Sequence, residues 1–229
     1  MNVGVLWSGG KDSTYAAFLA KQQGDQLACL ITICPSAEGS WMYHYPNIGW
    51  TKLQAQSANL PHVMVPTEGV KEVELADLSK ALVAAKSQYG IEGVYSGALA
   101  SVYQKSRVDR ICAELGLRSF SPLWRIDPKV HLLNLIRDCF ETIITGVAAL
   151  GLDESWLGRR LDGVMVEELV ELQRKHGMHA ALEGGEGETF VLDCPIFKER
   201  VEIVSSKKHW NGSYGYLEIL EARLVPKAD

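Results

Sequence analysis

The sequence lacks the paired cysteine spacing that is typical of disulfide, zinc and redox sites. The five cysteines are scattered along the chain, none is spaced as C-x-x-C, and most lie among apolar residues. An odd and scattered set argues against a disulfide framework and against a zinc or redox motif. We therefore expect reduced core residues at Cys29, Cys34, Cys112, Cys139 and Cys194.

Long apolar runs and an excess of basic charge are absent as well. No apolar run approaches the roughly 20 residues that cross a bilayer, and the N-terminus lacks the basic and apolar regions of a signal peptide. The net charge of -5 and a pI near 5.7 disfavour sequence-independent binding to nucleic acid, although they leave room for a local basic groove. We expect a cytoplasmic protein with no membrane segment and no nucleic-acid partner.

The first half of the chain alternates between strand-like and helical patterns. Apolar runs with strand character lie at residues 3–7, 27–34, 62–66, 93–96 and near Phe120. Helical patterns separate them, and one of the clearest has apolar residues at steps of three and four between residues 75 and 89. This alternation predicts an α/β fold with a five-stranded parallel, Rossmann-like sheet that binds ligands at the carboxyl ends of its strands.

The pattern changes after about residue 128. The later segments are helical patterns near residues 129–140 and 164–175, an apolar run at 142–150, and strand-like runs at 200–207 and 214–225. The two strand-like runs are joined by HWNGS, whose Asn-Gly pair is a hairpin signal. The sequence therefore predicts a nucleotide-binding domain over residues 1–127 and a smaller α+β domain over residues 128–229.

The stretch SGGKDS lies between the first strand-like run and a helical pattern, and it contains Ser8, Gly9, Gly10, Lys11, Asp12 and Ser13. The first turn of a helix has unpaired N–H groups and a partial positive charge, so it suits an anion. The glycines allow close backbone approach, the serines add hydroxyl donors, and the lysine adds a full positive charge. An aspartate would repel phosphate unless a cation lay between them, which indicates Mg²⁺ bound to a polyphosphate. The alternative is a plain polar turn with an N-cap.

Two further stretches combine aromatic, small and basic residues. SWMYHYPN, at residues 40–47, is an aromatic loop that serves a ligand or covers a sheet edge, and its His44 contacts phosphate or substrate or caps a turn. In YSGALASVYQKSRVDRIC, at residues 95–112, small residues at a strand end allow close backbone approach. The following helix places Tyr103, Arg107 and Arg110 at steps of four and three. This helix face contacts an anion, or it is only a solvated basic face.

A third stretch, EGGEGETFVLDCP, contains Glu183, Glu186 and Glu188 among glycines and directly before an apolar strand. Like charges this close repel one another unless a cation or a positively charged substrate lies among them. The apolar residues that follow indicate that the segment is anchored on a core, which favours a functional site. The alternative is a flexible acidic surface loop.

SGGKDS resembles the pyrophosphate loop of the N-type ATP pyrophosphatases, the PP-loop enzymes, which cleave ATP between its α and β phosphates. Six stretches in order, SGGKDS, SWMYH, SGALASVYQKSRV, SPLW, GLDESWLGR and EGGEGETFVLDCP, resemble the diphthine–ammonia ligase family over nearly the whole chain. The resemblance implies that ATP, ammonia and the diphthine residue of translation elongation factor 2 give diphthamide, AMP and pyrophosphate. The length resembles the short archaeal-type form of the family.

This reaction gives the candidate residues their expected roles. The expected catalytic residues are Lys11, Asp12, Glu186 and Glu188, and Asp12 is expected to place Mg²⁺ directly or indirectly. The expected ATP contacts are Ser8, Gly9, Gly10, Lys11, Asp12, Ser13, His44, Ser96, Gly97 and Ala98. The expected substrate contacts are Tyr43, Tyr103, Gln104, Arg107, Glu183 and Glu186, with Trp41 beside them. Free ammonia is the expected nitrogen donor, because no glutaminase signature is visible.

Two other functions share the same loop. A tRNA-thiolating or tRNA-amidating enzyme would use it, but such an enzyme is expected to show a reactive cysteine pair or a clear basic face. A non-catalytic ATP sensor would also keep it, because a nucleotide loop demonstrates binding and not turnover. The sequence leaves a homo-oligomer open.

Overall fold

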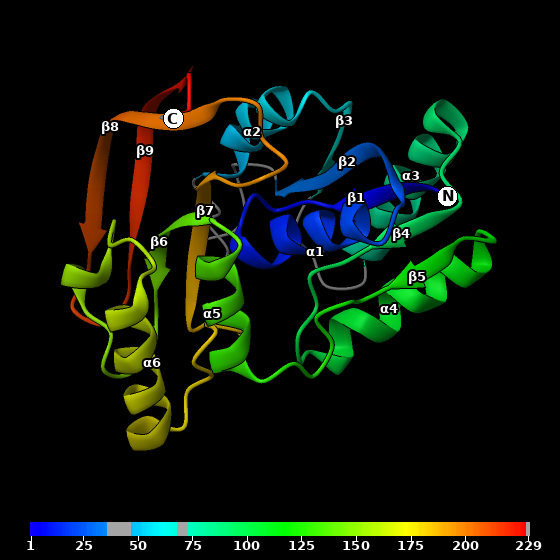
Figure 1. The fold of residues 1–229 in the computed structure, drawn as a ribbon. Helices are drawn as coiled ribbons and strands as arrows, with labels where there is room; N and C mark the ends of the chain where they lie inside the picture. Colours follow the sequence, from blue (N-terminus) through cyan, green and yellow to red (C-terminus); the bar gives the residue numbers. More distant parts are fainter. Residues whose placement is uncertain (36–46, 68–72, 228–229) are drawn as a thin grey trace. The chain divides into compact units, whose positions relative to one another are not determined.

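The computed structural model of the protein describes residues 1–35, 47–67 and 73–227. The chain forms two compact units, one made of residues 1–8 and 12–124 and the other of residues 9–11 and 125–229. The short segment 9–11 thus belongs to the second unit although the chain around it belongs to the first. Each unit is described by itself (Figure 1).

The first unit contains a five-stranded parallel sheet with the order β3-β2-β1-β4-β5. Its strands are β1 (Asn2–Leu6), β2 (Gln26–Pro35), β3 (His62–Thr67), β4 (Gly93–Tyr95) and β5 (Arg118–Phe120). Its helices are α1 (Lys11–Gln22), the short η1 (Ile48–Trp50), α2 (Thr51–Ala58), α3 (Val73–Tyr89) and α4 (Val102–Glu114). The strand order reverses between the two neighbours of β1, so β1 ends at the switch point of the sheet. The predicted five-stranded Rossmann-like fold is confirmed.

One core of the first unit lies between the sheet and the helices α3 and α4. Leu82 and Ala85 of α3 are fully buried there, while Leu75, Leu78 and Tyr89 pack at its margin. These are the apolar positions that the spacing of residues 75–89 predicts for the buried face of a helix, so that prediction is confirmed.

The second unit contains a four-stranded antiparallel sheet with the order β7-β6-β9-β8. Its strands are β6 (Glu141–Val147), β7 (Gly187–Asp193), β8 (Arg200–Trp210) and β9 (Gly215–Val225), and its helices are α5 (Pro128–Arg137), the short η2 (Glu154–Trp156) and α6 (Gly163–His176). The helices α5 and α6 pack against each other. Asp127 caps α5 by accepting the N–H of Val130, and Asp162 caps α6 by accepting the N–H of Met165.

The predicted hairpin between β8 and β9 is confirmed. The side-chain oxygen of Asn211 accepts the N–H groups of Ser213 at 3.0 Å and Tyr214 at 2.9 Å, and Gly212 has a φ of 99°. Glycine adopts this left-handed backbone without a steric penalty.

Two expectations about the region after residue 128 need correction. The helix expected near residues 129–140 ends at Arg137, because Cys139 takes a left-handed backbone with a φ of 59° before β6 begins. Cys139 is therefore exposed, and the prediction that all five cysteines are core residues is wrong for it. Cys29, Cys112 and Cys194 are buried as expected, Cys34 is half-buried, and all five cysteines are free.

No helix in the described part of the chain is long and apolar enough to cross a membrane.

Candidate functional site

The SGGKDS turn begins two residues after β1 and leads into the first turn of α1. Within the first unit, the N–H of Ser8 donates to the Oγ of Ser13 at 3.2 Å, and the two hydroxyl oxygens lie 3.2 Å apart. Gly9 has a φ of 78°, a left-handed backbone that favours glycine. Lys11 is buried, with 3% of its surface exposed. The turn therefore has a fixed backbone path and a lysine that is withdrawn from solvent.

Gly97 lies directly against the start of α1. A Cβ atom at Gly97 would lie 2.6 Å from the carbonyl carbon of Asp12 and 2.6 Å from the backbone nitrogen of Ser13. Only glycine fits at this distance, so the backbone of residue 97 closely approaches the start of α1. The approach joins the turn to the segment 96–98, where Ser96 is buried and its hydroxyl lies 3.0 Å from that of Ser121.

Residues 9–11 are held by the outer edge of β7 within the second unit. The N–H of Val191 donates to the carbonyl oxygen of Gly9 at 3.0 Å. The N–H of Lys11 donates to the Oγ1 of Thr189 at 3.1 Å. Sequence reasoning missed Thr189, because a threonine in a strand carries no local signal for a partner near the N-terminus of the chain.

The acidic stretch forms a turn with defined hydrogen bonds that leads into β7. Gly184 and Gly185 have φ values of 90° and 95°. The N–H of Ala148 donates to the carbonyl oxygen of Glu186 at 2.8 Å. Glu188 is exposed and lies within β7, paired in register with Gly146, so it is a strand residue rather than a loop residue.

Glu186 has an unusual environment for a carboxylate. Its Oε1 accepts the N–H of His179 at 3.1 Å. Its Oε2 is buried and has no hydrogen-bond partner among the described residues, and the same is true of the Nδ1 of His179. A buried carboxylate oxygen without a hydrogen-bond partner lowers the stability of the fold. The Glu186 carboxylate therefore suits a bound donor such as an ammonium group. His179 is the second residue that sequence reasoning missed.

The helix α4 places its candidate residues on one face, as expected. The guanidinium carbon of Arg107 lies 3.3 Å from the ring centroid of Tyr103, and its Nη1 donates to the carbonyl oxygen of Tyr103 at 3.4 Å. Gln104 is exposed, and its N–H donates to the hydroxyl of Ser101, which caps the helix. Arg110 pairs with Glu114 at 3.7 Å on the surface. Arg107 is thus stacked on an aromatic ring of its own helix.

The candidate residues of the expected aromatic loop lie within residues 36–46, which the structure does not describe. Trp41, Tyr43 and His44 therefore lie outside the described residues.

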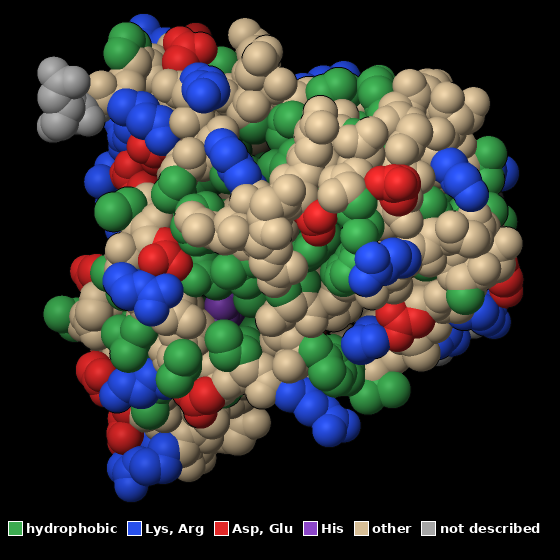
Figure 2. Space-filling view, turned by 45° about the vertical axis from the view of Figure 1, so that its right-hand side comes forward, with side chains coloured by type: hydrophobic (Ala, Val, Ile, Leu, Met, Phe, Trp, Pro, Cys, Tyr) green, Lys and Arg blue, Asp and Glu red, His purple; other side chains and the backbone are tan. Residues whose placement is uncertain are grey.

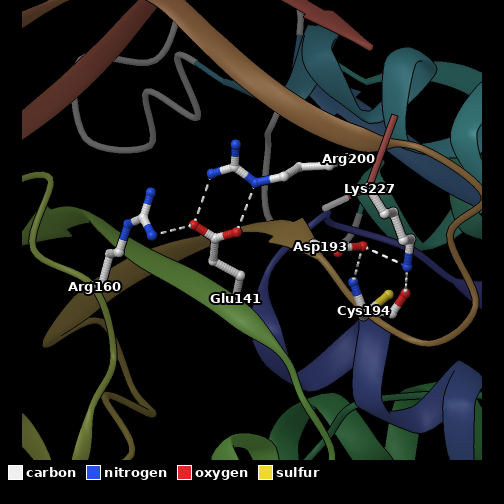
Figure 3. A network of polar contacts seen from close by, with 6 residues as sticks. All are labelled: Glu141, Arg160, Asp193, Cys194, Arg200 and Lys227. Carbon is white, nitrogen blue, oxygen red and sulfur yellow. Dashed lines mark hydrogen bonds and ion pairs between the residues drawn. The ribbon is translucent and has the colours of Figure 1, made fainter. Parts of the chain in front are cut away.

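Ion pairs surround the first residue of β6, Glu141, and the last residue of β7, Asp193 (Figure 3). Glu141 of β6 accepts two hydrogen bonds of 2.8 Å from the guanidinium of Arg200 and pairs with Arg160 at 2.7 Å. Asp193, the register partner of Glu141, pairs with Lys227 at 2.7 Å. Arg200 holds the pKa of the Glu141 carboxyl below its usual range. Arg200 thus ties β8 to β6, and Lys227 ties the segment after β9 to the end of β7, the strand that carries Thr189.

Four of the five cysteine thiols are poorly suited to nucleophilic chemistry. Burial raises the pKa of Cys29 and of Cys194 to about 12 and that of Cys112 to about 11. The pKa of Cys34 is raised by burial as well. The thiolate is the reactive form, so these groups are inert near neutral pH.

The residues of the turn fit a magnesium nucleotide. A helix N-terminus preceded by a left-handed glycine offers backbone N–H groups to phosphate, and the buried Lys11 adds charge. Asp12 lies in the first turn of α1, and the described residues contain no group of three or more His, Cys, Asp or Glu that could hold a metal ion. If Mg²⁺ binds with the nucleotide, Asp12 is the carboxylate of the turn that would hold it together with phosphate oxygens, because Mg²⁺ usually keeps few protein ligands.

Comparison with known proteins covers both halves of the chain. The family described as "Diphthamide synthase N-terminal domain" matches residues 1–119, and "Diphthamide synthase C-terminal domain" matches residues 127–225. The chain is 34% identical over 252 residues to the "Diphthine--ammonia ligase" of Bos taurus, covering 99% of this chain and 94% of that protein. It is 35% identical over 246 residues to the protein of the same name from Rattus norvegicus, covering 98% of this chain and 91% of that protein.

A longer relative and one solved structure are also similar. The "Diphthine--ammonia ligase" of Schizosaccharomyces pombe is 32% identical over 238 residues, which cover 96% of this chain and 39% of that protein. A solved Methanocaldococcus jannaschii protein, described as a "predicted subunit of tRNA methyltransferase", is 15% identical with a TM-score of 0.42, and the match covers 85% of this chain and 98% of that protein. The two family matches together span most of the sequence, and the expected family is confirmed. The chain belongs to the diphthamide synthase family.

Proposed function

We propose that this protein is an ATP-dependent ligase that amidates diphthine on translation elongation factor 2 with ammonia, giving diphthamide, AMP and pyrophosphate. The observation on which the proposal rests is the SGGKDS turn, with its left-handed Gly9 and its buried Lys11, in a chain of this family. The relatives are named diphthine–ammonia ligases, which supports the same acceptor and nitrogen donor.

The chemistry requires activation of a carboxylate. A carboxylate is a poor electrophile, and transfer of AMP to it gives a mixed anhydride that ammonia can attack, with AMP as the leaving group. Positioning and charge neutralisation supply most of the catalysis in such a reaction. Lys11 stabilises the departing pyrophosphate. Asp12 would hold Mg²⁺, which when bound would neutralise further negative charge on the phosphates.

The two parts of the chain take different tasks in this proposal. Residues 1–127 bind ATP, with the segment 96–98 close to the start of α1, and residues 128–229 bind the acceptor and ammonia. Diphthine carries a trimethylammonium group, which suits the negative charge of Glu183 and Glu188. Glu186 presents a buried carboxylate oxygen that has no partner among the described residues, and this acceptor suits a hydrogen atom of an ammonium ion.

The thiolating alternative receives no support from the described residues. Three of the cysteines have strongly raised pKa values because they are buried, and none of the five cysteines forms a disulfide. On the face drawn in Figure 2, basic and acidic side chains of the described residues are interspersed, without the broad basic field that tRNA binding would favour.

The test is a product analysis with a defined acceptor. The purified protein is incubated with Mg²⁺-ATP labelled at the α phosphate, ammonium and an elongation factor that carries diphthine. We expect labelled AMP, pyrophosphate and an amidated elongation factor only when ammonium and diphthine are both present. ADP and phosphate as products would contradict the mechanism, and ATP binding without turnover under these conditions would identify an ATP sensor instead.

A further inference from the structure

The outer edge of β7 forms hydrogen bonds with residues 9–11 and not with another strand of the described residues. Among the described residues, β7 pairs with β6 on one side and has no strand on the other. On that open side the N–H of Val191 donates to the carbonyl oxygen of Gly9, and the Oγ1 of Thr189 accepts the N–H of Lys11. Both ends of the short segment 9–11 are therefore fixed by main-chain and side-chain atoms of one strand.

The hydrogen bond to Thr189 holds the first backbone amide of α1. Lys11 is the first residue of α1, so its N–H is one of the helix amides without an intrahelical acceptor. The oxygen of Thr189, 3.1 Å away, fixes the direction of this amide. The Lys11 side chain starts from the same residue and is buried, so a shift of its backbone would move a confined positive charge.

The hydroxyl of Thr189 can form hydrogen bonds in addition to the one from Lys11. A threonine hydroxyl can donate one hydrogen and accept two, and the bond from Lys11 uses one acceptor position. Within the described ranges, the proton of this hydroxyl has no acceptor. It is free to rotate toward an additional acceptor near the turn without breaking the bond from Lys11.

We propose that Thr189 is a positioning residue of the pyrophosphate site. It acts through Lys11: the hydroxyl oxygen holds the first amide of α1, and thereby the Lys11 charge, in the place where the β and γ phosphates of ATP and the released pyrophosphate are bound. This inference rests on the proposed function for the identity of the anion. It adds that β7, a strand of the C-terminal half, determines the affinity of the N-terminal turn.

Substitution at Thr189 separates this role from a general effect on folding. Thr189→Val keeps the shape and the β-branched side chain but removes the acceptor, while Thr189→Ser keeps the hydroxyl. The matched control is Thr142→Val in the neighbouring strand β6. Thr142 is buried, its hydroxyl has no partner among the described residues, and it lies opposite Val191 in the register.

The measurement is equilibrium binding of Mg²⁺-pyrophosphate and of AMP by titration calorimetry. For Thr189→Val we expect pyrophosphate affinity to fall about 10-fold, the scale of one lost hydrogen bond, while AMP affinity stays within about 2-fold. Thr189→Ser should restore most of the loss, and Thr142→Val should bind both ligands as the unchanged protein does. If Thr189→Val does not fold, the pair Thr189→Ser and Thr189→Ala gives the same comparison.

Three outcomes would overturn the proposal. They are unchanged pyrophosphate affinity in Thr189→Val, an equal loss of pyrophosphate and AMP affinity with a lower melting temperature, and no pyrophosphate binding by the unchanged protein. The assay contains no elongation factor. Failure of amidation with the expected pyrophosphate pattern intact would therefore contradict the proposed function and leave the role of Thr189 standing.

Discussion

Replacement of Gly97 by alanine tests whether the close approach of residue 97 to α1 shapes the ATP site. The new Cβ would lie 2.6 Å from the Asp12 carbonyl carbon, 2.6 Å from the Ser13 nitrogen and 2.8 Å from the Asp12 carbonyl oxygen. Carbon atoms in contact are normally about 3.5–4.0 Å apart, so the overlap is about 1 Å. All three neighbours are backbone atoms, which cannot rotate away, and the start of α1 must move.

The magnitude follows from the overlap. One additional methyl group in a close-packed position costs about 1–3 kcal/mol of unfolding free energy. A displacement of about 1 Å at a reacting group lowers turnover by roughly 100-fold. Gly97→Ala should therefore remain folded but lose both ATP affinity and turnover. Gly49→Ala is the matched control in the same unit, because a Cβ at Gly49 would have no atom of the described residues within 4 Å.

The assay combines urea denaturation with calorimetric titration of Mg²⁺-ATP. We expect Gly97→Ala to lose about 1–3 kcal/mol of stability and at least about 10-fold in ATP affinity, while Gly49→Ala matches the unchanged protein in both. Full ATP affinity in Gly97→Ala, together with unchanged stability, would refute the reasoning that the backbone of residue 97 determines the position of the turn.

Three further predictions concern the acidic turn, the thiols and a half-buried histidine. Glu186→Gln and Glu188→Gln should keep ATP affinity within a few-fold but lower AMP formation in a single turnover by roughly 100-fold, and a collapse of ATP binding would instead place these residues at the nucleotide. Replacing all five cysteines by Ala or Ser in a folded background should leave ammonia-dependent AMP formation measurable, and loss of activity traced to one cysteine with the fold intact would favour a thiolating route. Burial lowers the pKa of His62 to about 4, with a smaller contribution from the nearby charge of Lys52. Above about pH 6.5 the ring is neutral in both the folded and the unfolded protein, so it costs no stability. As the pH falls from about 6.5 toward 4, the unfolded state binds a proton that the folded state does not, so the free energy of unfolding decreases. Urea denaturation should show that His62→Gln loses less stability than the unchanged protein over this range, by at most about 3 kcal/mol, and parallel pH profiles would contradict this.

The sequence was sufficient to predict the fold where the signal is local. The parallel sheet follows from the alternation of short apolar runs with helical spacing, and the hairpin follows from Asn211 and Gly212, whose backbone preferences act within four residues. The end of α5 was placed too late, because the apolar residues continue past Arg137 while Cys139 turns the backbone into the left-handed region. Hydrophobic periodicity does not report such a turn.

The candidate site was predictable in part for the same reason. SGGKDS is a contiguous signal, and the small residue at position 97 indicated a close backbone approach, although its partner is the start of α1. Thr189 and His179 were missed because their partners are set by tertiary structure: Lys11 lies 178 positions from Thr189, and Glu186 lies seven positions from His179 across a turn of glycines. Residue types alone also did not reveal that Arg107 stacks on Tyr103.

The long separation between Lys11 and Thr189 has a consequence for synthesis on the ribosome. The SGGKDS turn is among the first segments to be translated, but the strand that holds it follows 178 positions later. At a translation rate of about 5–20 residues per second, the nascent chain waits roughly 10 to 35 seconds for this partner. A chain that stops before β7 has neither the Thr189 bond nor the Val191 bond. Fragments released early by the ribosome therefore cannot hold the turn as the finished protein does.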